Sequence, residues 1–194
     1  MTRMGPLLER NEQFARDFTP VPLGLPAAQL IVVACLDHRA DPAIVLGLRL
    51  ADAPVIRNAG GRVTQAVIED LAYLAFLVEQ LSAGQGPLDT LFEVAVLHHT
   101  QCGTGFLADS GFRHQAAEVT GLPEAVLAAS AVVDPYTTVA SDVERLLTSP
   151  LLSPKVSVSG HVYDVDTGRV TTTLDARYPQ STAATAATDV QAAR

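Results

Sequence analysis

The chain has 194 residues, of which 48% are hydrophobic, and a formal net charge of −8 at pH 7. This length fits one domain, and the apolar content exceeds what a soluble monomer usually needs, so part of it is expected to lie between subunits. The acidic charge, without a cluster of lysines or arginines, argues against nucleic acids and membrane surfaces as partners.

Two cysteines and the lack of a secretory pattern at the N-terminus favour the cytoplasm as the location. We expect a single domain over residues 1–178, in which residues 1–26 form a helical arm. Within this arm, residues 6–18 are predicted to be an amphipathic helix, and three prolines keep residues 20–26 extended. The small, polar segment 179–194 is predicted to be a disordered tail.

Three apolar segments are predicted to be β-strands, at 28–36, 53–58 and 90–99. The first, AQLIVVACL, is rich in β-branched residues, which is typical of a strand buried on both faces of a parallel sheet. A hairpin is predicted over 155–174, with its turn at Asp166–Gly168. This order indicates an α/β fold with a mostly parallel central sheet, flanked by helices and ending in a hairpin.

Helices are predicted at 64–81, 111–119 and 138–148. Thr64 is expected to cap the first of them at its N-terminus. Tyr73, Phe76 and Leu77 widen its apolar stripe almost to the whole circumference, so we expect a buried helix that meets a partner subunit. The chain is therefore predicted to form a homodimer or a larger homo-oligomer.

Chemically active residues directly follow two of the predicted strands. The first strand ends at Cys35, Asp37 and Arg39, and the third ends at His99 and Cys102. Sheets of this kind bind ligands beyond the carboxyl ends of their strands, so neighbouring strands would bring both cysteines and His99 together. Two thiolates and one imidazole suit tetrahedral Zn²⁺, and three protein ligands leave a fourth position for water, as in catalytic sites.

Three motifs, CLDHR at 35–39, VIRNAGGRVT at 55–64 and HHTQCG at 98–103, resemble the β-class carbonic anhydrase family. They are most similar to the short bacterial branch with a double histidine, which also includes carbonyl sulfide and carbon disulfide hydrolases. The resemblance implies that Zn²⁺ is the cofactor and that its ligands are Cys35, His99 and Cys102. It also implies a loop beside the site, made of Asn58, Gly60, Gly61 and Gly103.

The resemblance further implies that Asp37 and Arg39 form a catalytic dyad beside the metal. Asp37 either becomes the fourth zinc ligand, which closes the site, or pairs with Arg39, which leaves that position to water. A bidentate guanidinium is a partner that can compete with a metal for a carboxylate. Hydroxide formed at zinc near neutral pH would then attack carbon dioxide and yield bicarbonate.

The substrate and the role of the first histidine stay open. Gln101 stands where the branch often has an acidic residue, and His38 stands where a small residue is more usual. Carbon dioxide hydration is therefore the first hypothesis, carbonyl sulfide or carbon disulfide hydrolysis the alternative, and a non-catalytic, zinc-stabilised binding module the third. Because adjacent strand residues point to opposite faces, we expect His98 to face away from the metal. His38, His114 and His161 are expected to be exposed or to have polar partners.

Overall fold

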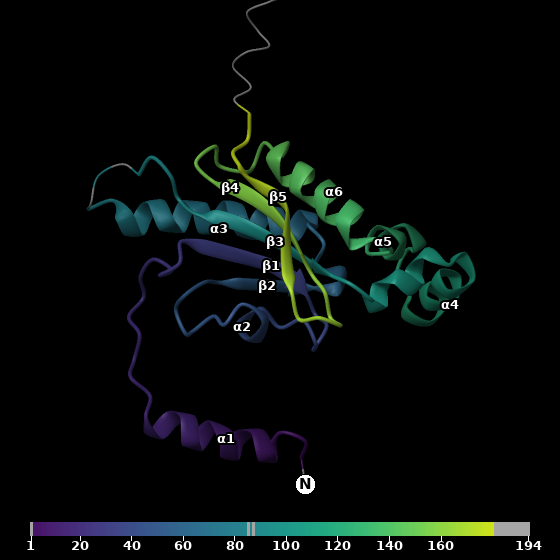
Figure 1. The fold of residues 1–194 in the computed structure, drawn as a ribbon, viewed down its shortest axis with the longest axis horizontal. Coiled ribbons are helices and arrows are strands. Elements are labelled where there is room, and N and C mark those ends of the chain that lie inside the picture. Colours follow the sequence, from purple (N-terminus) through teal and green to yellow (C-terminus); the bar gives the residue numbers. More distant parts are fainter. Residues whose placement is uncertain (1, 85, 87, 181–194) are drawn as a thin grey trace, which may run out of the picture.

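The computed structural model describes residues 2–84, 86 and 88–180, which form a five-stranded sheet with helices around it (Figure 1). The strand order is β2-β1-β3-β4-β5. The strands are β1 (Leu30–Cys35), β2 (Val55–Asn58), β3 (Glu93–His99), β4 (Ser157–Tyr163) and β5 (Val170–Arg177). The first four are parallel, and β5 pairs with β4 in the antiparallel direction. The predicted α/β fold, with its mostly parallel sheet and C-terminal hairpin, is therefore confirmed.

The helices are α1 (Gly5–Arg16), α2 (Pro42–Val45), α3 (Gln65–Ser82), α4 (Ser110–Thr120), α5 (Glu124–Ala129) and α6 (Pro135–Leu147), with 3₁₀ turns η1 (Ala59–Gly61) and η2 (Gly103–Ala108). The predicted helix at 138–148 begins earlier, at Pro135. The Asp134 side chain there accepts hydrogen bonds from the next free N–H groups, and proline fits a first helical turn. The helices α2 and α5 were not predicted because they are too short to show helical periodicity.

The main core lies between one face of the sheet and the helices α3 and α6. Along β3, Val94 and Val96 face this core, whereas Leu97 belongs to a small cluster on the opposite face. Each fully buried aliphatic side chain stabilises the fold by roughly 1.5–3 kcal/mol. This alternation therefore determines, up to the last residues of β3, which side chains point to which face of the sheet. It follows that His98 and His99 lie on opposite faces of the sheet.

Two helices present apolar surface that the other described residues do not cover. In α3, Leu71 is 0% exposed, but Tyr73 and Phe76 are 62% and 57% exposed, so a single chain buries one side of this helix only. The helix α1 contains no buried residue, and Figure 1 shows it apart from the sheet, at the end of an extended segment.

Two predictions concern the ends of the chain. The domain limits stay a prediction, and from residue 181 on the predicted disordered tail lies outside the described residues. Within the described part of the chain, no helix has both the length and the apolarity that crossing a membrane requires.

Candidate metal centre

The carboxyl ends of β1 and β3 meet at the edge of the sheet. These two strands are parallel neighbours, with Ala34 opposite Leu97, so Cys35 and His99 end adjacent strands. Cys102 follows three residues later, and its Sγ lies 3.9 Å from Sγ of Cys35. Ligand atoms of Cys35, His99 and Cys102 all lie within 4.8 Å of one another. The predicted convergence of these three side chains is therefore present in the structure.

The orientation of His99 leaves one ring nitrogen free for a ligand. Its Nδ1 lies 2.8 Å from the Thr100 carbonyl oxygen, which only accepts hydrogen bonds, so the ring proton is on Nδ1. The other nitrogen, Nε2, is buried and has no hydrogen-bond partner among the described residues. An unpaired buried nitrogen beside two sulfur atoms is the arrangement expected of a metal ligand.

The two cysteines are poised to bind a cation. A hydrogen bond between them lowers the pKa of Cys102 and raises that of Cys35, because the pair shares one proton. Thr104 Oγ1 lies 3.1 Å from Cys102 Sγ, where its hydroxyl can donate to a thiolate. Thiolates and imidazole are borderline-to-soft ligands, so this set of donors fits Zn²⁺.

Asp37 and Arg39 form a bidentate pair at the mouth of this cluster. Arg39 Nη2 donates to Asp37 Oδ2 at 2.7 Å, and Arg39 Nε donates to Asp37 Oδ1 at 3.0 Å. These hydrogen bonds hold the pKa of Asp37 well below its ordinary value. Asp37 Oδ2 is also 3.8 Å from Nε2 of His99, so the carboxylate lies beside the cluster while Arg39 holds it.

Gln101 explains part of how Arg39 is held. Arg39 Nη2 also donates to the Gln101 carbonyl oxygen at 3.0 Å, and Gln101 Nε2 donates to Asp166 Oδ2 at 2.6 Å. An acidic residue at position 101 would be repelled by Asp166, so the amide suits this chain. Gln101 has φ 53°, so it, and not Gly103, supplies the left-handed backbone of the turn.

The predicted site loop lies directly behind Cys35. Asn58 closes the loop, because its side chain donates to the Arg62 carbonyl and accepts from the Arg62 N–H, both at 2.8 Å. A Cβ on Gly61 would lie 2.8 Å from the Cys35 backbone nitrogen, and Gly61 has φ +66°, so the close approach requires glycine. Gly103 begins η2, and the place that a Cβ would take on it is open space.

Sequence reasoning missed the role of Arg57. Its guanidinium donates to the Cys35 carbonyl at 2.9 Å, to the Asp37 carbonyl at 2.8 Å and to Asp41 Oδ2 at 2.8 Å. The side chain therefore holds the backbone that carries Cys35 and the dyad. Its position at the end of β2, directly before the glycine-containing loop, is the signal that could have revealed it.

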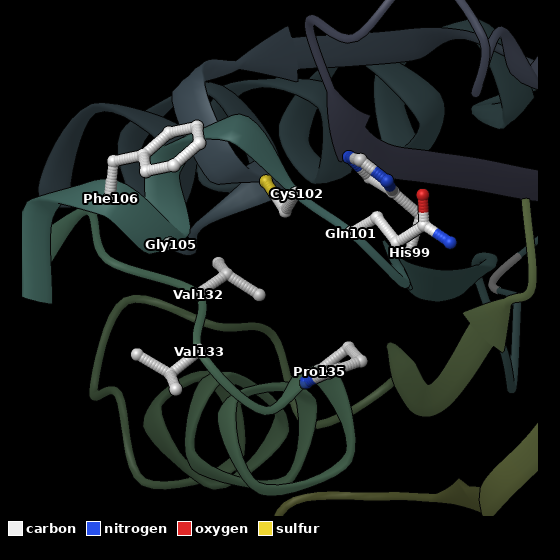
Figure 2. A pocket seen from close by; sticks show the side chains of 8 residues that line it. All are labelled: His99, Gln101, Cys102, Gly105, Phe106, Val132, Val133 and Pro135. Atoms are coloured by element: carbon white, nitrogen blue, oxygen red, sulfur yellow. The ribbon is translucent and has the colours of Figure 1, made fainter.

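A cavity of about 330 Å³ opens onto His99 and Cys102. Its lining residues are His99, Gln101, Cys102, Gly105, Phe106, Val132, Val133 and Pro135. Figure 2 shows Val132 and Pro135 on the side of the cavity opposite Cys102 and His99. The wall opposite the cluster is thus apolar.

The other histidines lie where the sequence predicts. His98 is buried on the far face of the sheet, where its Nδ1 lies 2.9 Å from Thr138 Oγ1. The side chain of His38 is 93% exposed, His114 lies beside Glu124, and His161 has the hydroxyl partners Ser159 and Thr172.

Known proteins with similar sequences support one family. A scan against models of protein families finds no match. Beta-carbonic anhydrase 1 of Mycobacterium tuberculosis is 32% identical over 171 residues, which cover 88% of this chain and 97% of the relative. A carbon disulfide hydrolase of Acidithiobacillus thiooxidans is 29% identical over 168 residues, which cover 76% of this chain and 79% of the relative.

Solved structures agree. The crystal structure of a carbonic anhydrase from Streptococcus mutans matches with a TM-score of 0.68 at 32% identity, and the match covers 89% of this chain and 98% of that one. Both similarities therefore extend over most of the chain. This chain belongs to the β-carbonic anhydrase family and is an enzyme of that type.

Proposed function

We propose that this chain catalyses the reversible hydration of carbon dioxide to bicarbonate with a zinc ion held by Cys35, His99 and Cys102. The observation that carries the proposal is the buried Nε2 of His99, which has no hydrogen-bond partner among the described residues and lies beside two cysteine sulfurs. When bound there, zinc would lower the pKa of a water molecule to about 7 and so supply a nucleophile near neutral pH.

The residues of the chain orient the reaction. Arg39 holds Asp37 at the mouth of the cluster, so that a carboxylate oxygen can accept a hydrogen bond from the attacking water and direct its lone pair. Because Asp37 is a carboxylate in this pairing, it accepts and does not donate. The Thr100 carbonyl fixes the ring of His99, and Arg57 fixes the backbone of Cys35. Each bicarbonate formed releases one proton, which makes turnover dependent on buffer.

The apolar wall supports a small, uncharged substrate. Val132, Val133 and Phe106 offer no hydrogen bonds, so they suit a linear molecule such as carbon dioxide.

Hydrolysis of carbonyl sulfide or carbon disulfide is the second candidate. It is favoured by the similarity to the Acidithiobacillus carbon disulfide hydrolase, at 29% identity. These molecules are also linear and uncharged, so the same centre and the same wall could serve them. They differ from carbon dioxide in the size of the sulfur atom, which makes the width of the cavity the deciding quantity.

One preparation with quantified zinc tests these candidates. Carbon dioxide hydration is followed by stopped flow, and hydrogen sulfide release is followed from carbonyl sulfide and carbon disulfide. Cys102→Ala should lose both zinc and turnover, while His114→Gln, on the exposed face of α4, should retain them. Much faster hydration of carbon dioxide supports the first proposal, and sulfide release with slow hydration supports the second. If one zinc per chain gives neither rate, the chain is a non-catalytic, zinc-stabilised module.

We also propose that the enzyme is a homodimer or a larger homo-oligomer in the cytoplasm. The exposed Tyr73 and Phe76 on α3 and the unburied helix α1 support assembly, since large apolar side chains are usually covered. Light scattering of the full chain, compared with a Phe76→Arg variant, tests this. A wild-type monomer would contradict it.

A further inference from the structure

A buried ion pair lies behind the cavity, and none of the proposed chemistry uses it. Arg62 Nε donates to Asp142 Oδ2 at 2.7 Å, and Arg62 Nη2 donates to Asp142 Oδ1 at 3.1 Å. The side chains of Arg62 and Asp142 are 17% and 3% exposed. Removing two charges from water costs free energy that the pair does not reliably recover, so stability alone is a weak reason for it.

Arg62 also holds the backbone of a third segment. Its Nη1 donates to the Ala129 carbonyl at 2.7 Å and to the Ala131 carbonyl at 3.0 Å. The helix α5 ends at Ala129, so the guanidinium caps carbonyls at a helix C-terminus, where a cation is favourable. One side chain therefore joins the loop after η1, the helix α6 and the segment 129–133.

Two glycines press against the same segment from the side of the metal cluster. A Cβ on Gly60 would lie 2.8 Å from the Ser130 carbonyl oxygen, and a Cβ on Gly105 would lie 3.0 Å from the Val132 carbonyl oxygen. The segment therefore cannot move closer to the cluster, and the hydrogen bonds of Arg62 keep it from moving away.

This segment carries the apolar wall. Val132, Val133 and Pro135 follow the carbonyls that Arg62 holds and line the cavity, and Val132 and Pro135 lie across it from Cys102 (Figure 2). Val132 is 3% exposed, so it is a packed part of this wall. The position of the segment thus determines the distance between the wall and Cys102.

The same carboxylate also reaches the strand that carries the cluster. His98 Nε2 lies 3.2 Å from Asp142 Oδ2, and His98 directly precedes His99 on β3. Asp142 therefore contacts both Arg62, which holds the wall, and β3, which ends at the cluster. This gives the first histidine of the pair a place in the site without contact to the metal.

We propose that Arg62 and Asp142 are positioning residues that fix the width of the cavity at Cys102 and thereby select substrates by size. Substrate selection rests on the proposed function, whereas the control of cavity width does not. When Arg62 holds the wall close to Cys102, the cavity favours carbon dioxide. When the wall is no longer held, the wider cavity admits the larger sulfur atom of carbonyl sulfide.

The width can be measured without turnover. After zinc is removed by chelation, Cys102 of the full chain is alkylated with N-methylmaleimide or with N-cyclohexylmaleimide, and peptide mass mapping separates it from Cys35. Both reagents react with the same thiolate, so the ratio of the two rates reports access and not pKa. Arg62→Lys keeps a charge for Asp142. However, its three donors sit on one nitrogen, whereas Arg62 makes four hydrogen bonds from three separate nitrogens. The lysine therefore cannot hold the carboxylate and both carbonyls in the same places, and the ratio should shift several-fold towards the bulky reagent.

Three further variants make the test decisive. Gly105→Ala pushes the wall without touching the ion pair and should shift the ratio in the same direction. Glu144→Gln removes an exposed ion pair with Arg177 from the same helix and should leave the ratio unchanged. If Arg62→Lys does not fold, the apolar replacement Arg62→Met with Asp142→Leu takes its place, since such exchanges of buried pairs are usually tolerated. A folded variant of the ion pair with the wild-type ratio overturns the proposal.

Kinetic measurements on the zinc-loaded variants test whether the width of the cavity selects the substrate. For Arg62→Lys, the ratio of kcat/KM for carbonyl sulfide to that for carbon dioxide should rise roughly 10-fold, the scale of a small change in pocket volume. An unchanged ratio of kcat/KM overturns selection by size. If neither substrate is converted by the wild type, the proposed function fails, while the maleimide ratio still decides whether Arg62 positions the wall.

Discussion

Two Arg–Asp pairs in this molecule have nearly the same geometry and very different surroundings. Arg39 and Asp37 meet at 2.7 Å at the mouth of the cluster, with side chains 42% and 13% exposed. Arg62 and Asp142 also meet at 2.7 Å, but their side chains are 17% and 3% exposed. A guanidinium and a carboxylate thus form two ion pairs, one that water reaches and one from which water is almost excluded.

This difference teaches what each pair can do. In water, separating an exposed pair costs little, so Asp37 can exchange partners, as a dyad beside a metal requires. In the interior, separating the pair leaves uncompensated charge, so Arg62 and Asp142 stay together and hold the segments they connect. We therefore infer that burial, and not the hydrogen-bond geometry, decides which of the two pairs can separate.

The largest expected effect is on stability. Asp142→Asn should lower the free energy of unfolding by about 3–5 kcal/mol, because the Arg62 guanidinium stays buried without its counter-charge. Asp37→Asn should change it by about 0–1 kcal/mol, since water replaces the lost partner. Urea unfolding of zinc-loaded protein measures both. Equal losses for the two variants would contradict the comparison.

The pH dependence of the difference in stability between wild type and Asp142→Asn follows from the pKa of Asp142. Burial raises that pKa, but the neighbouring His98 and Arg62 side chains outweigh the burial, so the folded-state pKa of Asp142 lies below its ordinary value. A lowered folded-state pKa contributes stability that is fully present above the unfolded value and is lost as the pH falls through the folded value. The stability gap between wild type and Asp142→Asn should therefore persist from pH 7 to pH 4 and narrow only in stronger acid.

The second effect is on turnover. Arg39→Ala should lower kcat/KM for carbon dioxide by about 10²-fold, because Asp37 is no longer held where it can orient the attacking water. Its melting temperature and zinc content should stay close to those of the wild type, which separates loss of orientation from loss of the fold. A variant with unchanged kcat/KM would remove Arg39 from the proposed mechanism.

The sequence reveals the exposed pair and not the buried one, for a physical reason. Asp37 and Arg39 lie two residues apart at a strand end, next to Cys35, so a short motif contains the whole pair. Strand adjacency then brings in His99 and Cys102, because apolar runs identify buried parallel strands.

The buried pair leaves no such local signal. Arg62 and Asp142 are 80 positions apart, and the other partners of Arg62 are backbone carbonyls, which no residue type marks. For a similar reason the short helix α5, whose end Arg62 caps, could not be predicted. Contacts built from backbone atoms and distant side chains become visible only once the fold is known.

A third Arg–Asp pair supports the residues of the metal cluster and gives a smaller effect. Arg57 and Asp41 have side chains 24% and 42% exposed, and Arg57 also holds the Cys35 and Asp37 carbonyls. Arg57→Lys should weaken zinc binding by about 10-fold to 100-fold, as is typical of residues that support metal ligands. Competition with a chromophoric chelator measures this. Arg49→Lys, whose side chain is 88% exposed and pairs with Asp52, is the control that should bind zinc like the wild type.

The smallest effect belongs to the pair of His114 and Glu124, which lies at the surface of α4 and α5. A hydrogen bond with Glu124 raises the pKa of His114 above its ordinary value. A raised folded-state pKa contributes stability that is fully present below the unfolded value and is lost as the pH rises through the folded value. His114→Gln should therefore lower the melting temperature slightly at pH 6 and not at pH 9. If the difference in melting temperature between wild type and variant grew with pH, its sign would contradict this prediction. A large difference would contradict the comparison, which requires an exposed ion pair to be weak.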